Sequence, residues 1–297
     1  MPSPGRDRRV PPSPSRGRKH SALDPPAAHP IPRARMVSHM VDIHSHILWE
    51  LDDGSSSMEE SVAMMQVASE SGTTDIVASP HSNSEYAYLP ELVDRRIREL
   101  TAATGGQPRV LRGCDFHLSF DNIDHLLDRP GTYTINGKQY LLVECPDFHV
   151  GKHTEIVLQR LVDSGIVPVV THPERNQVLQ RKLGRVEEWV ELGCLVQVTA
   201  LSVTGGFGGA AGSACNKLLD RGLVHVVASD AHDPKHRSPN LDKARKTIRS
   251  RYGDDAAELL FTENPRNIIE GLPVVGGKQP CLDAPKRWWR FWKSRAD

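Results

Sequence analysis

Short apolar runs rich in β-branched residues recur from Met40 onward, and most of them end in a polar residue and precede a helical pattern. Near-continuous apolar runs of this kind are typical of strands that are buried on both faces of a parallel sheet, with helices as the crossovers. The pattern therefore predicts seven strands, at Val41–His46, Thr74–His81, Arg109–Phe116, Tyr140–Cys145, Val167–His172, Cys194–Thr199 and Val224–Asp230.

The segments between these runs carry helix signals. Met58–Ser71 has apolar residues at helical spacing and is followed by Gly72, which is typical of a helix C-terminus. Asn264 followed by Pro265 predicts the N-cap and first turn of a later helix. Because strands and helices alternate without an internal repeat or a second domain, we expect a single α/β barrel.

Composition divides the chain into three segments. Residues 1–39 are rich in Pro, Ser and Arg, which predicts a disordered basic extension, and residues 40–271 are predicted to form the folded domain. The basic tail at 272–297 holds three of the five tryptophans, interleaved with Lys and Arg. This composition favours either peripheral contact with an anionic membrane surface or docking of the aromatic residues on the barrel or another subunit. The oligomeric state stays open.

The formal net charge of +0 conceals a strong asymmetry. Residues 1–35 carry eight basic and two acidic residues, and residues 272–297 carry six and two. The intervening segment is left with 23 Lys+Arg and 33 Asp+Glu, a net charge of −10. An acidic domain argues against nucleic acid as a partner, since such proteins need a basic face, and it suits a protein that binds cations.

The cysteine pattern and hydropathy indicate the compartment. Five cysteines without regular spacing predict no disulfide framework and favour a reducing environment. The chain has no run of about 18 apolar residues that would span a membrane. We therefore expect a cytoplasmic protein, with peripheral attachment at the inner face of the membrane if the tail binds lipid.

Six of the seven predicted strands end in a residue that could bind a metal ion. In an α/β barrel the C-terminal ends of the strands meet at one face, so residues far apart in sequence converge there. One such residue alone would more often be a hydrogen-bonded core histidine, but chance does not place a whole set at successive strand ends. The set comprises His44, His46, His81, Asp115, Glu144, His172, Asp230 and His232.

Two local patterns strengthen the prediction of a metal site. His44 and His46 lie two residues apart on a strand, so both imidazoles point to the same face and can hold one ion. Imidazole and carboxylate together suit manganese, iron or zinc. Asp52-Asp53-Gly54 follows the first strand and is either a simple turn, which Asp-Gly favours, or a further source of ligands.

Several motifs together resemble the polymerase-and-histidinol-phosphatase (PHP) superfamily. Within it they are most similar to the manganese-dependent protein-tyrosine phosphatases of bacterial capsule and exopolysaccharide operons, the CpsB/CapC type. The resemblance covers about residues 40–271, which would then be a PHP phosphatase domain. It rests on the motifs Asp42–Leu48, Asp52–Gly54, Ser79–His81, Thr171–Asn176 and Ala228–Asp233.

The resemblance implies a distorted (β/α)₇ barrel with up to three divalent ions, manganese or alternatively iron, zinc, cobalt or magnesium, at the C-terminal ends of its strands. It further implies a metal-bridging hydroxide that attacks phosphorus in line. The implied ligands are His44, His46 and Asp230 for one ion, Glu144 and His172 for a second, Asp115 as the bridge between those two, and Asp53, His81 and His232 for the third.

The resemblance also assigns phosphate-binding residues and a partner. Arg175 and Arg237 match the arginines that bind substrate phosphate in the family. The implied substrate is a phosphotyrosyl protein, above all the tyrosine-rich tail of a membrane-associated bacterial tyrosine kinase. Asp115 stands where the family usually has Glu, so a shorter side chain must bridge the ions.

The sequence also bears on four other functions. A PHP phosphoesterase for histidinol phosphate or a nucleotide, and a catalytically weak scaffold whose tail is the functional part, stay open. An amidohydrolase is disfavoured because Glu144 stands where such enzymes typically have a bridging lysine. A cysteine-based phosphatase is disfavoured because the Cys-x₅-Arg spacings at 215–221 and 281–287 lack the glycines and the preceding histidine of a phosphate-binding loop.

Overall fold

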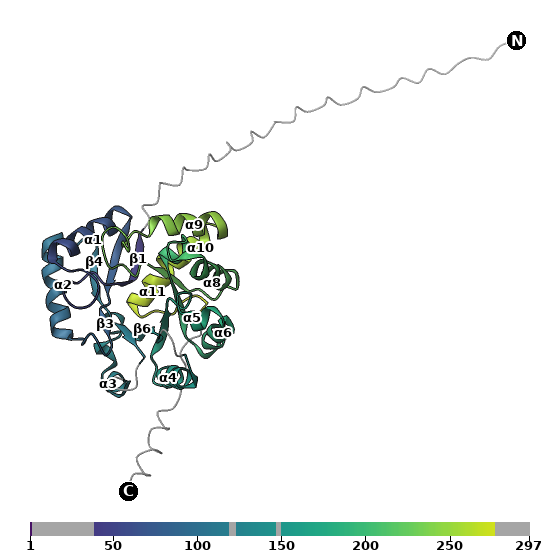
Figure 1. Cartoon of the computed structure of the whole chain (residues 1–297). Coiled ribbons are helices and arrows are strands. Elements are labelled where there is room, and N and C mark those ends of the chain that lie inside the picture. The colour runs from purple at the N-terminus through teal and green to yellow at the C-terminus, as the bar shows by residue number, and fades with distance from the viewer. Residues whose placement is uncertain (2–38, 119–122, 147–149, 277–297) are drawn as a thin grey trace, which may run out of the picture. The chain divides into compact units, whose positions relative to one another are not determined.

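The computed structural model describes residues 1, 39–118, 123–146 and 150–276. The predicted N-terminal extension, apart from its first and last residues, and the Trp-rich part of the predicted C-terminal tail lie outside the described residues. All described helices and strands lie between Met40 and Glu270, and the helices surround the strands (Figure 1).

The strands form two parallel sheets, in the orders β1-β2-β4 and β3-β5-β6-β7-β8-β9. Parallel order throughout is what the near-continuous apolar runs predict. The strands are β1 (Met40–Ser45), β2 (Thr73–Ala78), β3 (His81–Ser82), β4 (Arg109–Arg112), β5 (Asp115–His117), β6 (Tyr140–Glu144), β7 (Val167–Thr171), β8 (Leu195–Thr199) and β9 (Val226–Ala228).

Two of the predicted strands are each broken in two. The run predicted at Thr74–His81 is divided into β2 and β3, and the run at Arg109–Phe116 is divided into β4 and β5. Gly113 lies at the second break, where a Cβ atom would come 2.5 Å from Cγ1 of Val77. Only glycine permits that close approach of neighbouring strands. At both breaks the chain passes from the first sheet into the second, so the two sheets are continuous.

The ring is closed by hydrogen bonds between β1 and the segment after β9. The Asp230 amide donates to the His44 carbonyl at 2.9 Å, and the His46 amide donates to the Ala231 carbonyl at 2.8 Å. Ser45 and Ala231 form the corresponding parallel bridge. When β2 with β3 and β4 with β5 are each counted as one strand, the described strands form a barrel of seven. This confirms the predicted distorted α/β barrel.

Helices connect most of the strands and cover the sheets (Figure 1). The predicted helix at Met58–Ser71 is confirmed as α1, which is capped by the Ser57 hydroxyl accepting from the Glu60 amide. The helices are α1 (Met58–Glu70), α2 (Pro90–Thr104), α3 (Ile123–Asp128), α4 (Lys152–Asp163), α5 (Gln177–Gln180), α6 (Leu183–Leu192), α7 (Ala200–Val203), α8 (Gly208–Asp220), α9 (Asp242–Tyr252), α10 (Asp254–Glu258) and α11 (Asn264–Glu270), with 3₁₀ turns η1 (Pro130–Thr132) and η2 (Ile135–Gly137) and a π-helical turn η3 (Leu259–Glu263).

The predicted N-cap at Asn264 is wrong. The chain is already helical when it reaches this residue, because η3 leads directly into α11, and Asn264 itself has φ −63° and ψ −47°. Its buried side chain instead donates to the carbonyls of His225 and Val275 and accepts from the Val275 amide. These tertiary hydrogen bonds occupy the amide group that a capping role would have used.

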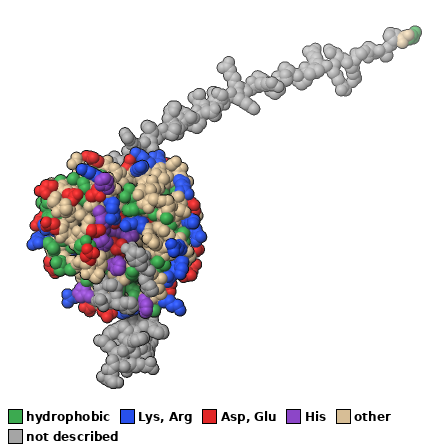
Figure 2. Space-filling view, viewed as in Figure 1, with side chains coloured by type: hydrophobic (Ala, Val, Ile, Leu, Met, Phe, Trp, Pro, Cys, Tyr) green, Lys and Arg blue, Asp and Glu red, His purple; other side chains and the backbone are tan. Residues whose placement is uncertain are grey.

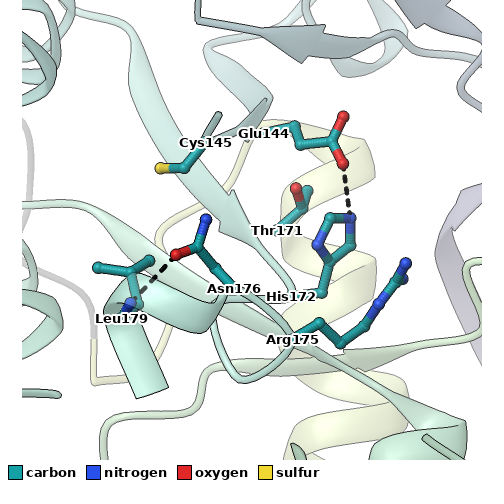
Figure 3. Close-up of a pocket in the computed structure, with 7 residues that line it drawn as sticks. All are labelled: Glu144, Cys145, Thr171, His172, Arg175, Asn176 and Leu179. Atoms are coloured by element: carbon teal, nitrogen blue, oxygen red, sulfur yellow. Dashed lines mark hydrogen bonds and ion pairs between the residues drawn. The ribbon is translucent and has the colours of Figure 1, made fainter. Parts of the chain in front are cut away.

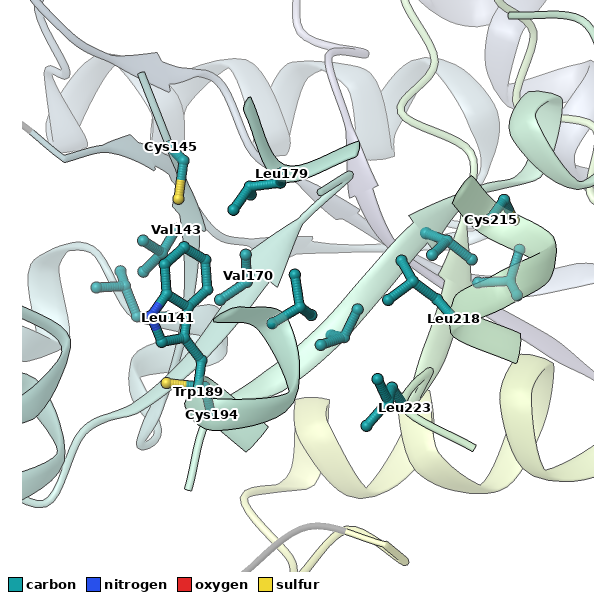
Figure 4. Close-up of a cluster of buried hydrophobic side chains, with 14 of the residues drawn as sticks. Leu141, Val143, Cys145, Val170, Leu179, Trp189, Cys194, Cys215, Leu218 and Leu223 are labelled. Atoms are coloured by element: carbon teal, nitrogen blue, oxygen red, sulfur yellow. The ribbon is translucent and has the colours of Figure 1, made fainter. Parts of the chain in front are cut away.

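Successive residues of β6 point into different buried clusters. Leu141 and Val143 pack in one cluster with Trp189 of α6 (Figure 4). Leu142 belongs to a second cluster with Ile268 of α11. Both faces of the sheet therefore pack against apolar side chains at β6.

Candidate metal centre

Seven of the nine predicted ligands lie near the C-terminal end of a strand or in the loop just beyond it. The other two, His81 and Asp115, begin the short strands β3 and β5, which follow the breaks after β2 and β4. Figure 2 shows histidine, basic and acidic side chains gathered near the middle of the viewed face. The ligands fall into four overlapping groups, in each of which the candidate atoms lie within 4.8 Å of one another. The groups are His46, Asp53, His81 and His232; His44, His46 and Asp115; His44, His172 and Asp230; and His81, Asp115 and Glu144.

Two residues outside the predicted ligand set orient the His-x-His pair at the end of β1. His44 Nδ1 lies 2.9 Å from Oε1 of Gln197, and His46 Nδ1 lies 2.6 Å from Oδ2 of Asp52. These contacts leave both Nε2 atoms, 3.3 Å apart, facing the cluster. Partners of this kind orient metal-binding imidazoles and tune their basicity. The available signal was Gln197 itself, a polar residue in the middle of a buried strand.

Asp115 lies at the centre of the cluster and is fully buried. Its Oδ2 is 3.5 Å from His44 Nε2 and 3.4 Å from His81 Nδ1. Burial raises the pKa of this carboxyl, but the neighbouring His44 and His81 outweigh it and hold the pKa below its usual range. Neither oxygen accepts a hydrogen bond from any described residue. A buried, ionised carboxylate without donors is suited to bind a cation, so the residues present fit a metal.

Glu144 and His172 form the side of the cluster next to a small pocket of about 100 Å³ (Figure 3). Glu144 Oε1 lies 3.5 Å from His172 Nε2. Burial and the nearby Asp115 carboxylate raise the pKa of Glu144 to about 7. Burial and Arg175 lower the pKa of His172, so its imidazole is neutral, the form that binds metal ions.

Asp53 lies at the exposed rim of the cluster. Its Oδ1 is 3.4 Å from His81 Nε2 and 3.3 Å from His232 Nε2. These three residues are the predicted ligands of the third ion, and the structure adds His46 to their group. Asp52, the preceding residue in the Asp-Asp-Gly turn, instead accepts from the amides of Gly54 and His81 and so fixes the turn.

Both predicted arginines converge on Asp230. Arg175 Nη1 donates to Asp230 Oδ2, and Arg237 Nη2 donates to the same oxygen at 2.6 Å. Asp230 and His172 also have positive φ values, 51° and 33°, which are rare for residues other than glycine. Backbone conformations of this kind cluster at functional sites, where the surrounding structure holds them.

The cysteine-based alternative is not supported by the described residues. Cys215 is fully buried in the hydrophobic core on α8 (Figure 4), and burial raises the pKa of its thiol. A buried thiol with a raised pKa is a poor nucleophile. Cys281, the other candidate, lies outside the described residues.

Comparisons with known proteins match most of the chain to one family. The family model for capsular polysaccharide synthesis, CpsB/CapC, matches residues 40–270. The chain is 31% identical over 239 residues to the tyrosine-protein phosphatase CpsB of Streptococcus pneumoniae, covering 77% of this chain and 98% of that relative. It is 31% identical over 253 residues to the tyrosine-protein phosphatase YwqE of Bacillus subtilis and 33% identical over 259 residues to the putative tyrosine-protein phosphatase CapC of Staphylococcus aureus, each covering 84% of this chain and 98% of the relative.

Solved structures give the same picture. The structure matches a chain from the crystal structures of YwqE from Bacillus subtilis and CpsB from Streptococcus pneumoniae, described as metal-dependent tyrosine phosphatases. The TM-score is 0.74 at 29% identity, and the match covers 81% of this chain and 98% of that one. A phosphotriesterase homology protein from Escherichia coli matches with a TM-score of 0.53 at 11% identity, covering 78% and 99% of the two chains, a likeness of fold alone. No helix within the described ranges is long and apolar enough to cross a bilayer.

Proposed function

The chain belongs to the CpsB/CapC family of capsular polysaccharide synthesis, and on that premise we propose that it is a metal-dependent protein-tyrosine phosphatase. One observation carries the proposal, namely the meeting of nine candidate ligands between His44 and His232 with two arginines beside them. Cations and guanidinium groups together offset the charge of a phosphate monoester and orient its oxygens.

Manganese is the proposed metal, because a mixed set of five imidazoles and four carboxylates suits it and rules out a purely hard or purely soft site. Against three divalent ions, four carboxylates leave about two positive charges, enough for a phosphate dianion. When bound, the ions would neutralise charge on the phosphoryl oxygens and lower the pKa of a coordinated water. The proposed ligands are His44, His46, Asp53, His81, Asp115, Glu144, His172, Asp230 and His232.

Arg175 and Arg237 are the proposed phosphate-binding residues. Both guanidinium groups reach Asp230, so a phosphoryl oxygen at the cluster lies within range of both. Planar guanidinium donors suit the spacing of phosphate oxygens and stabilise the charge that develops on them. The tyrosine phenolate is a ready leaving group because its pKa is near ~10, so the reaction needs no covalent phosphoenzyme.

The proposed substrate is a phosphotyrosyl segment of a membrane-associated bacterial tyrosine kinase that acts in capsule or exopolysaccharide synthesis. The family description, capsular polysaccharide synthesis, supports this choice. Peripheral membrane contact through the Trp-rich tail would bring the two proteins together, and the sequence from Lys286 to Lys293 supports it. Binding of the purified chain to anionic vesicles, compared with a variant that ends at residue 276, tests that contact.

Turnover of a phosphotyrosyl peptide, measured with and without added manganese, tests the proposed activity. We expect hydrolysis that depends on manganese and exceeds that of histidinol phosphate. Replacing His44 and His46 together with alanine should abolish it while the fold persists. A folded, manganese-loaded wild-type chain that leaves the peptide intact would contradict the proposal and favour a binding scaffold.

A further inference from the structure

One aromatic side chain lies directly against both arginines of the site. The guanidinium carbon of Arg175 is 4.4 Å from the centroid of the Phe207 ring, and that of Arg237 is 5.9 Å from it. Both arginines reach Asp230 with their terminal nitrogens. Phe207 therefore borders the place where a phosphate held by these arginines would lie.

The loop that carries Phe207 combines glycines in the left-handed region with backbone hydrogen bonds. Gly205 and Gly208 flank it with φ values of 83° and 84°, a conformation that other residues adopt only with strain. The Gly206 amide donates to the Leu201 carbonyl at 2.7 Å, and the Gly208 amide donates to Gly205 at 3.1 Å. The loop is thus hydrogen-bonded to α7 and to itself.

The hydrophobic core does not account for Phe207. It is partly exposed and belongs to none of the three buried apolar clusters found among the described residues. An aromatic ring outside the core, in contact with two arginines and open to solvent, is available to a ligand.

We propose that Phe207 recognises the aromatic ring of the substrate and makes the site selective for aryl over alkyl phosphates, an inference that rests on the proposed phosphatase activity. In an aryl phosphate one oxygen joins the ring to phosphorus. A phosphate on Arg175 and Arg237 therefore places the aryl group beside Phe207. Aromatic pairs prefer offset or edge-to-face contacts, which a serine or threonine ester cannot make.

A simpler role for Phe207 would be to position the two arginines through cation–π contact. The two roles differ in what they do to different substrates. If the ring only positions Arg175 and Arg237, its loss lowers kcat/KM for every phosphate ester to the same extent. If it contacts the substrate, its loss lowers kcat/KM for aryl esters alone.

The test uses the full-length, manganese-loaded chain and its Phe207→Leu and Phe207→Trp variants. The value of kcat/KM is measured for a phosphotyrosyl peptide and for the phosphoseryl peptide of the same sequence. We expect Phe207→Leu to lower the phosphotyrosyl value about tenfold and leave the phosphoseryl value unchanged, whereas Phe207→Trp keeps the preference. Equal losses for both peptides would overturn the inference.

A second readout separates this inference from the phosphatase activity itself. Binding of benzylphosphonate and of butylphosphonate, which cannot be hydrolysed, is measured on the same variants by calorimetry. The wild-type chain should prefer the aryl compound, and Phe207→Leu should remove that preference. If the wild-type chain prefers the aryl phosphonate but shows no turnover, the proposed activity is wrong and the role of Phe207 is supported. If the wild-type chain shows no preference for the aryl phosphonate, the role of Phe207 is wrong.

Tyr86 provides a matched control. Its ring stacks on His81, with centroids 6.0 Å apart and planes 16° from parallel, so it lies beside the cluster without a described contact to the arginines. Tyr86→Leu should leave the ratio of aryl to alkyl kcat/KM unchanged. If Tyr86→Leu instead removes the preference and Phe207→Leu does not, the aryl group lies against Tyr86 and the assignment to Phe207 is wrong.

Discussion

At the scale of single residues, some of the candidate ligands carry protons that a metal ion must displace. Burial opposes protonation of His46, but Asp52 and Asp230 outweigh burial and raise the pKa of its imidazole well above the usual value. Asp115 is ionised within the same cluster. Without a metal, protons on imidazoles therefore balance the carboxylates, and a metal ion must replace them.

Metal affinity should consequently rise with pH. Because the pKa of His46 is raised, its proton is bound below that pKa and competes with the ion, and the competition ends as pH rises through the pKa. We expect manganese to bind at least about tenfold more weakly near pH ~6 than near pH ~8, with release of protons. Calorimetry in buffers of different ionisation enthalpy measures both quantities. Equal affinities at the two pH values would contradict this account.

Removing the charge of Asp115 should weaken metal binding at the cluster. Asp115→Asn keeps the side-chain volume in a fully buried position but removes the anion that neighbours His44 and His81. We expect manganese affinity to fall at least about 100-fold, together with turnover. Elemental analysis and a metal titration measure the loss.

Asp75→Asn is the matched control for this substitution. Asp75 lies near the start of β2 and pairs with Arg109, away from the candidate ligands. Its replacement should leave metal content unchanged. Retention of full metal content in folded Asp115→Asn would exclude Asp115 as a ligand.

At the scale of strands and loops, the breaks between β2 and β3 and between β4 and β5 decide where the ligands lie. His81 and Asp115 pair directly across β3 and β5, so the two bends bring both into the second sheet. The His81 ring and the Asp115 carboxylate then meet at 3.4 Å. Gly113, two residues before Asp115, permits the second bend.

Gly113→Ala should therefore disturb both stability and the site. Its Cβ atom would come 2.5 Å from Cγ1 of Val77, so either the Val77 side chain or one of the two strands must shift. We expect a loss of about 1–3 kcal/mol in the free energy of unfolding, with weaker metal binding because Asp115 moves with β4 and β5. Denaturant unfolding and a metal titration measure the two effects. Gly184→Ala in α6, where the space is open, should not destabilise the protein.

The elements also show how far the sequence predicted this structure. The strands and the convergence of their ends follow from local patterns, because apolar runs and terminal polar residues are properties of short segments. The bend at Gly113 and the role of Asn264 depend on which segments pack together, so no local pattern reveals them. Gln197 is visible in the sequence as a polar residue in an apolar run, but its role is not, since its partner His44 lies 153 residues away. The ligand roles themselves stay predictions.

At the scale of the whole molecule, the acidic domain gathers like charges at one end of the barrel. Asp115, Glu144 and Asp230 lie close enough that Asp115 and Asp230 both raise the pKa of Glu144. Repulsion among these carboxylates destabilises the folded state wherever protonated imidazoles do not offset it, and bound cations relieve it. The metal should therefore contribute to global stability as well as to catalysis.

Chelation should lower the thermal midpoint of unfolding. An ion at about 100 times its Kd adds about 2.7 kcal/mol to the folded state, which corresponds to about 5 °C or more for a domain of this size. Differential scanning calorimetry in EDTA and in excess manganese measures the shift. Asp115→Asn should show a much smaller shift. Identical midpoints for the wild-type chain in both conditions would mean that folding and metal binding are not coupled.

The hydrogen bonds between β1 and the segment after β9 join two parts of the polypeptide that a ribosome makes far apart in time. His44 and His46 emerge early, but they stay without Asp230 until most of the domain has been translated. A prematurely terminated product that lacks the last strand can have neither a closed ring nor a complete set of ligands. A complete set of ligands can therefore form only after almost the entire domain has been synthesised.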